Sequence, residues 1–151
     1  MMMRAILSSA LAVTFVAGVS GQAKPNFVGT WKPDPARSKP IGGLGPTQTI
    51  AIEGSKMTIT RTVAGNSAST VYMLDGTPSK NVSGPADKPI EITYTSKWEG
   101  PVLVTTWSSP AITNIERRSI QEDGTMKVEV THNVTKESTT EVSSRVFAKV
   151  K

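Results

Sequence analysis

From Gln48 to the C-terminus the sequence alternates between apolar and polar residues with a period of two, and this pattern constrains the fold more than any other feature. The segment 56–63 shows it clearly, because Met57, Ile59 and Arg61 share one face while Lys and Thr occupy the other. A period of two is typical of β-strands with one buried face. No helical periodicity follows residue 40, so strands alone must build the core.

Short turn signals divide this pattern into roughly eight to ten strands. The turns include Gly54-Ser55, Asp75-Gly76 and Glu122-Asp123-Gly124. The predicted strands cover residues 26–32, 49–53, 56–63, 69–74, 79–82, 91–98, 102–107, 112–120, 126–134 and 138–150. Consecutive strands joined by short turns form an antiparallel meander, which closes into an all-β up-and-down barrel. A β-sandwich is the main alternative, but it usually needs longer crossover connections.

The first 23 residues have the pattern of a secretory signal peptide. A cationic start at Met1–Arg4 is followed by an apolar run over 5–19 and by small residues, with cleavage expected after Ala23. The run is shorter than the roughly 20 residues needed to span a bilayer, which argues against a retained anchor. No other stretch is long and apolar enough to cross a membrane. We therefore expect one barrel domain over 24–151, periplasmic or secreted.

Composition removes several classes of function. The chain has no cysteine, which excludes thiol nucleophiles, iron–sulfur clusters and Cys-based zinc sites. Its net charge of +5 is spread out rather than clustered, which argues against nucleic-acid binding. His132 is the only histidine, and zinc needs about three or four protein ligands. We therefore expect no metal, no cofactor and no nucleic-acid partner.

Several short motifs resemble the calycin superfamily, which contains the lipocalins and the fatty-acid-binding proteins. Phe27–Lys32, with its Gly-x-Trp, is similar to their first strand, and 144–149 resembles the Arg-x-Tyr strand with which fatty-acid-binding proteins end. The whole predicted domain resembles small exported bacterial lipocalin-like proteins. The further matches are Pro35 with Ser38-Lys39, Thr60-Arg61-Thr62, Leu74-Asp75-Gly76 and Trp98-Glu99-Gly100. This resemblance implies a lipocalin-like barrel with Phe27–Lys32 at its closed end.

Two departures separate the chain from the fatty-acid-binding group. Residues 33–47 are too rich in Pro and Gly to form a helix-turn-helix lid, so Ile41–Pro46 is predicted to be a flexible connector and a flap over one barrel mouth. Phe147 stands where the carboxylate-binding Arg-x-Tyr has its tyrosine.

Four residues on the predicted inward faces are candidates for binding a ligand: Arg61, Tyr94, Arg118 and His132. A buried cation needs a partner, because an unpaired one costs several kcal/mol. That partner is either an internal carboxylate such as Glu116 or an anionic ligand. Aliphatic walls with a few polar groups are how small-molecule sites are usually built. The alternative is that these residues lie near strand ends, where their charged heads reach water.

The last strand gives conflicting signals for Arg145. Apolar residues alternate along one face, which predicts that this face is inside: Val142, Val146, Ala148 and Val150. The resemblance instead places Arg145 and Phe147 inside. In a third arrangement Arg145 stacks on Trp31 at the closed end, a contact worth about 1 kcal/mol. We favour the third arrangement, in which Trp31 and Arg145 are structural residues that close the barrel.

The leading functional hypothesis is an exported lipocalin-like barrel that binds a small, partly apolar molecule, including one with an anionic group. The second is a ligand-free structural or interaction protein of the bacterial envelope with a filled barrel. An enzyme is the third, and we expect no enzyme here. Its acid and base would have to come from His132 and Glu116, because no Gly-x-Ser-x-Gly elbow or phosphate loop is present.

Overall fold

The computed structural model describes residues 23–108, 112–134 and 139–151. The predicted signal peptide lies outside the described residues apart from Ala23. Among the described residues, no helix is both long and apolar enough to cross a membrane.

The described residues form ten antiparallel strands and one short 3-10 turn. The elements are β1 (Gly29–Pro33), η1 (Pro35–Arg37), β2 (Gln48–Glu53), β3 (Lys56–Val63), β4 (Asn66–Met73), β5 (Ser79–Ser83), β6 (Ile90–Glu99), β7 (Val102–Ser108), β8 (Ile112–Ile120), β9 (Met126–Val134) and β10 (Thr139–Lys149). All ten strands belong to one sheet, in the order β4-β3-β2-β1-β10-β9-β8-β7-β6-β5. The sheet curls into a nearly closed barrel, which confirms the predicted all-β fold.

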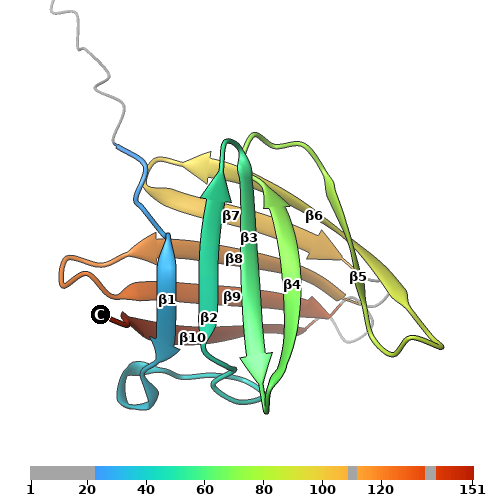
Figure 1. Ribbon diagram of the computed structural model, residues 1–151, viewed down its shortest axis with the longest axis horizontal. Coiled ribbons are helices and arrows are strands. Elements are labelled where there is room, and N and C mark those ends of the chain that lie inside the picture. Colours follow the sequence, from blue (N-terminus) through green and yellow to red (C-terminus); the bar gives the residue numbers. More distant parts are fainter. Residues whose placement is uncertain (1–22, 109–111, 135–138) are drawn as a thin grey trace, which may run out of the picture.

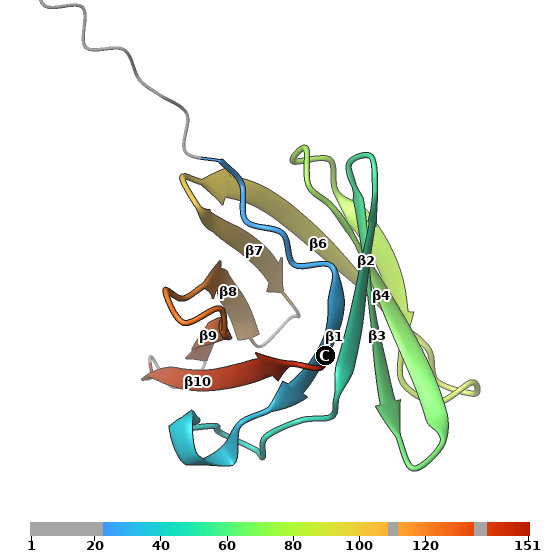
Figure 2. The ribbon, with the colours of Figure 1, turned by 60° about the vertical axis from the view of Figure 1, so that its left-hand side comes forward.

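The barrel is flattened into two layers whose strands cross at a steep angle. In Figure 1, β1–β4 stand upright in front of β6–β10, which run across the view. Figure 2 shows the two layers facing each other, with β1 passing from one to the other. The core lies between them and consists of Phe27, Trp31, Ile50, Met57, Ile59, Tyr72, Leu103, Met126, Val128, Val130 and Phe147. The period-two pattern predicted the inward faces of β3 and β9 correctly.

The first strand buries Trp31 in the core. The side chain is 1% exposed, and its Nε1 donates a hydrogen bond to the Phe27 carbonyl at 2.8 Å. Lys149, the register partner of Trp31 on β10, places its ammonium group 5.4 Å from the indole centroid. A Cβ on Gly29 would lie 2.7 Å from Lys149 Cε, so glycine makes room for this contact. The stacking expected of Arg145 on Trp31 is therefore made by Lys149.

The last strand presents Phe147 to the interior, so the prediction from its apolar residues is wrong. Phe147 is 3% exposed within the core, whereas Val142 is 58% exposed. Val146 is buried on the outer face, because the connector after β1 covers it: Asp34 N donates to the Val146 carbonyl, and Val146 N donates to Ser38 Oγ. The apolar pattern of β10 indicated the wrong inward face because the connector after β1 buries Val146 on the outer face of the barrel.

The barrel has one seam, between β4 and β5, where no backbone ladder joins the two edge strands. The side chain of Asn81 takes the place of a ladder step there. Its Oδ1 accepts from Val71 N at 2.8 Å, and its Nδ2 donates to the Val71 carbonyl at 2.9 Å. Ser79 Oγ donates to the same carbonyl at 2.7 Å. Tyr72 of β4 and Tyr94 of β6 add an edge contact between their rings, with centroids 5.2 Å apart.

Replacing Asn81 with alanine should therefore loosen the seam. Both hydrogen bonds to Val71 and a longer one to Ser79 would be lost, and the Val71 amide would be left unpaired, so we expect a loss of about 1–3 kcal/mol in unfolding free energy. Hydrogen exchange should show Val71 N–H losing protection more than the amides of β8 and β9. Asn133→Ala, which removes an exposed bond to Thr140, is the control and should change little. Unchanged protection of Val71 would mean that the Asn81 side chain does not hold β4 to β5.

Candidate ligand-binding pockets

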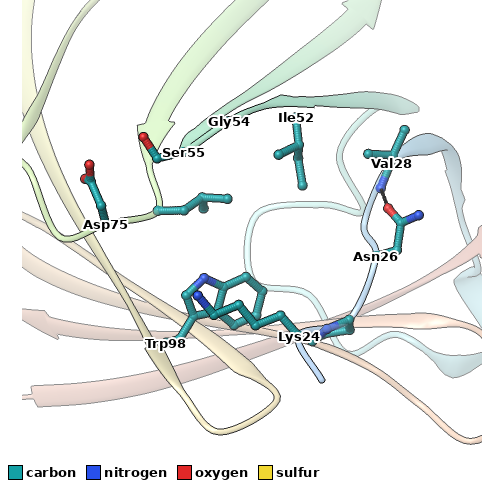
Figure 3. Close-up of a pocket in the computed structure, with 10 residues that line it drawn as sticks. Lys24, Asn26, Val28, Ile52, Gly54, Ser55, Asp75 and Trp98 are labelled. Carbon is teal, nitrogen blue, oxygen red and sulfur yellow. Dashed lines mark hydrogen bonds between the residues drawn. The ribbon is translucent and has the colours of Figure 1, made fainter. Parts of the chain in front are cut away.

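A pocket of about 590 Å³ opens at the barrel end where β1 begins. We call it the mouth pocket. It is lined by Lys24, Pro25, Asn26, Val28, Ile52, Gly54, Ser55, Leu74, Asp75 and Trp98. Figure 3 shows Ile52 of β2 and Trp98 of β6 on opposite sides of it, with the segment before β1 forming a third side. This volume is within the usual range of small-molecule sites, about 300–1,000 Å³.

The wall formed by Trp98 is rigid because aromatic packing holds it. The Phe27 ring stacks on the Trp98 indole with centroids 5.9 Å apart and an angle of 4° between the planes. Phe27 is fully buried, and it anchors the segment 24–28 to the barrel. Asn26 Oδ1 accepts from Val28 N and stiffens the same segment. Stacked rings of this kind add about 0.5–1.5 kcal/mol beyond their buried area.

The mouth pocket carries one charge of each sign. The ammonium group of Lys24 lies 5.5 Å from the Trp98 ring centroid, and Figure 3 shows its side chain along the indole. A hydrogen bond from Thr77 N lowers the pKa of Asp75 below its usual value, so this carboxylate is ionised at neutral pH. The Asp75 carboxylate accepts this hydrogen bond within its own turn. Neither Lys24 nor Asp75 has a salt-bridge partner among the described residues.

A second and much smaller space, about 70 Å³, lies beneath residues 44–46. We call it the inner cavity. It is lined by Leu44, Gly45, Pro46, Gln48, Arg61, Glu116, Arg118, Val128, Arg145 and Phe147. Arg145 Nε donates to the Gly43 carbonyl and Arg145 Nη2 donates to the Ile41 carbonyl, both at 3.2 Å. The connector predicted as a flap is therefore held against the barrel by Arg145, which had been expected to stack on Trp31.

Arg118 has the internal carboxylate partner that the sequence analysis proposed. Its Nη2 lies 2.7 Å from Glu116 Oε1, and its Nε donates to the same oxygen at 3.2 Å. The Arg118 side chain is 1% exposed and that of Glu116 is 10% exposed. Gln48 Oε1 also accepts from Arg118 Nη1. Arg118 is thus neutralised within the protein.

Among the described residues, Arg61 donates side-chain hydrogen bonds to neutral hydroxyl groups alone. Its Nη1 donates to Thr70 Oγ1 at 3.1 Å, and its Nη2 donates to the Tyr72 hydroxyl at 3.4 Å. Burial, and then the nearby Glu116 charge, raise the pKa of Tyr72, so its hydroxyl stays neutral. Burial acts to lower the pKa of Arg61, but Tyr72 and Glu116 outweigh it and the net shift is upward. Arg61 is therefore a partly buried cation with no carboxylate within salt-bridge distance among the described residues.

The other two predicted site residues line neither pocket. Tyr94 packs between Tyr72 and Trp107, and burial raises the pKa of its hydroxyl. His132 Nδ1 is hydrogen-bonded to Asn114 Oδ1. Because Glu116 is paired with Arg118, the acid/base pair of His132 and Glu116 is not formed. The roles of Tyr94 and His132 in binding stay predictions.

Most residues of the mouth pocket carry no signal in the sequence. Val28, Ile52 and Leu74 are ordinary apolar strand residues, and Lys24 lies before the first predicted strand. The pocket exists because the ends of β2, β4 and β6 meet the segment before β1. The only signal in the sequence was the resemblance of Phe27–Lys32 and Trp98–Gly100 to calycin motifs, and it pointed to a closed end.

Solved structures of other proteins share the fold of this chain. No family model matches the sequence, and no curated protein does. The solved structure of a "REP1-NXSQ fatty acid transporter" matches with a TM-score of 0.62 and 20% identity, over 82% of this chain and 96% of that chain. A tyrosine-to-phenylalanine mutant of that transporter matches with a TM-score of 0.59 and 20% identity, over 82% and 97%. At this identity the likeness concerns the fold alone: this chain and the transporter share an antiparallel, nearly closed β-barrel.

The buried ion pair gives a prediction for stability. Glu116→Gln keeps a hydrogen-bond acceptor but removes the charge that balances Arg118, so unfolding free energy should fall by about 3 kcal/mol. The control is Glu99→Gln, which breaks only exposed contacts to Lys97 and Arg117 and should leave the unfolding free energy almost unchanged. Urea denaturation of both variants measures the difference. Equal losses would mean that Glu116 does not compensate a buried charge.

Proposed function

We propose that this protein is an exported barrel that binds a small amphipathic molecule in the mouth pocket, with the apolar part of the ligand against Ile52, Leu74 and Trp98. The observation that carries the proposal is the pocket itself: about 590 Å³, with aliphatic and indole walls and a few polar groups at its edge. Sites of this composition derive affinity from apolar burial, at about 25 cal/mol per Å² removed from water.

The anionic part of the ligand is assigned to Lys24. Lys24 is the one cation that lines the mouth pocket among the described residues. Cleavage after Ala23 would make Lys24 the first residue and add an α-ammonium group at the same edge. The solved neighbours of this fold are described as fatty acid transporters, which is consistent with an amphipathic acid as the class of ligand.

The second candidate is a barrel without a ligand, as a structural or interaction protein of the envelope. The observation that favours it is the filled interior between the two pockets. Ile50, Met57 and Leu103 are each about 1% exposed, and the inner cavity is only about 70 Å³. A protein of this kind would show no saturable binding of amphipathic acids.

Titration with 8-anilinonaphthalene-1-sulfonate, followed by displacement with decanoate, tests the proposed function. Binding should change tryptophan fluorescence through Trp98, so Trp98→Phe should remove most of the change and Trp107→Phe should preserve it. Lys24→Gln should weaken binding by about 1 kcal/mol, roughly fivefold in Kd, since an ion pair at an exposed lysine contributes no more. The matched control is Lys80→Gln on β5. No saturable binding, or equal effects of Lys24→Gln and Lys80→Gln, would reject the assignment.

Export has its own test. Expression of the full chain in a Gram-negative host should yield a periplasmic protein whose first residue, by N-terminal sequencing, is Lys24. Replacing Ala23 with a bulky residue should block processing at that bond. Recovery of the uncleaved chain from the cytoplasm would contradict the proposal.

A further inference from the structure

The tripeptide Asp-Gly-Thr occurs in two turns of the barrel, at 75–77 between β4 and β5 and at 123–125 between β8 and β9. In both turns the aspartate Oδ1 accepts a hydrogen bond from the backbone N–H of the threonine, at 3.0 Å. An aspartate in this position stabilises its turn without any cation. Asp123 nevertheless has one, because its Oδ2 lies 2.7 Å from Arg37 Nη1. Asp75 has no salt-bridge partner among the described residues, so its negative charge is uncompensated.

The uncompensated charge of Asp75 borders the mouth pocket. Figure 3 shows Asp75 on the same side of the pocket as Ser55, which comes from the turn between β2 and β3. A backbone hydrogen bond ties the two turns together, since Leu74 N donates to the Ser55 carbonyl at 2.7 Å. A carboxylate has about four acceptor positions, and the hydrogen bond from Thr77 N uses one of them. This side of the pocket therefore presents an anion that can still accept from a cationic donor.

Lys24 supplies the opposite charge at a separate point of the same pocket. Its ammonium group lies 5.5 Å from the Trp98 ring centroid, and the face of the indole attracts a cation in this position. Lys24 and Asp75 both line the pocket, yet they do not appear together among the ion pairs of the described residues. The lining also includes the apolar side chains of Ile52 and Leu74. A ligand that satisfies both charges must therefore carry an anion and a cation joined by an apolar segment.

We infer that the mouth pocket selects bipolar ligands of the ω-amino-acid class, with the carboxylate at Lys24, the terminal ammonium group at Asp75 and the aliphatic chain between them. The inference rests on the proposed function and narrows its class of ligand. A simple fatty acid would use Lys24 but leave Asp75 facing the end of its hydrocarbon chain. Because exposed ion pairs contribute little affinity, the second charge acts mainly on specificity.

Isothermal titration calorimetry at neutral pH tests this selectivity with two series of ligands: the simple acids from hexanoate to dodecanoate, and the same acids with a terminal amino group. Affinity for the simple acids should rise with chain length, because more apolar surface is buried. Affinity for the amino acids should instead pass through a maximum at the length that spans Lys24 and Asp75. At that length the amino acid should bind up to about fivefold more tightly than the simple acid.

Asp75→Asn removes the charge but keeps an oxygen that can accept from Thr77 N, so the turn should be preserved. This variant should lose both the length maximum and the preference for amino acids, while it binds simple acids at least as tightly as the native protein. Asp123→Asn is the matched control, because it makes the same change in the same tripeptide away from the pocket. It should retain the maximum and the preference.

The length series on the native protein decides the question even where Asp75→Asn does not fold. The inference is overturned if the amino acid binds no more tightly than the simple acid at every length, or if Asp75→Asn retains the preference. Saturable binding of the simple acids would in that case leave the proposed function standing. If neither series binds, both the proposed function and this inference are rejected.

Discussion

β1 is hydrogen-bonded along one edge to β2 and along the other to β10, and this double pairing joins the two layers of the barrel. The strand has only five residues, yet it carries Trp31, whose indole is buried and bonded to the Phe27 carbonyl. Closing a sheet on itself removes the exposed edges that would otherwise recruit other chains. In a chain with no cysteine to cross-link it, this closure and the core beneath it supply the stability.

Because β1 closes the sheet on one side, its two edge strands, β4 and β5, meet on the opposite side of the barrel without a backbone ladder. Strand twist and the crossing of the two layers carry these edges apart, and the side chains of Asn81 and Ser79 replace the missing backbone bonds. The same geometry shapes the two ends. At the end where β1 begins, strand ends splay and leave the mouth pocket. At the other end, Arg145 holds the glycine-rich connector over the inner cavity.

The polar residues inside the barrel follow from this arrangement. Period-two reasoning placed Arg61, Arg118 and His132 on inward faces, and the need for a partner predicted the pairing of Arg118 with Glu116. The same reasoning failed on β10, because Val146 is buried against the connector on the outer face while Arg145 points inward. The separate expectation that Arg145 stacks on Trp31 also failed, because Lys149 occupies that place. Both errors arise from contacts between residues far apart in the sequence. The connector after β1 buries Val146, and the position of Trp31 decides that Lys149 rather than Arg145 lies over its ring.

The sequence by itself determined the fold class, most strand boundaries and the inward faces of β3, β6 and β9. These depend on alternation and turn residues, which are local properties of the chain. Only the tertiary structure decided where the hollows lie, because a pocket is defined by which strand ends meet. Lys24, Ile52, Leu74 and Trp98 are far apart along the chain and share the mouth pocket because β1 brings the segment before it against the ends of β2, β4 and β6.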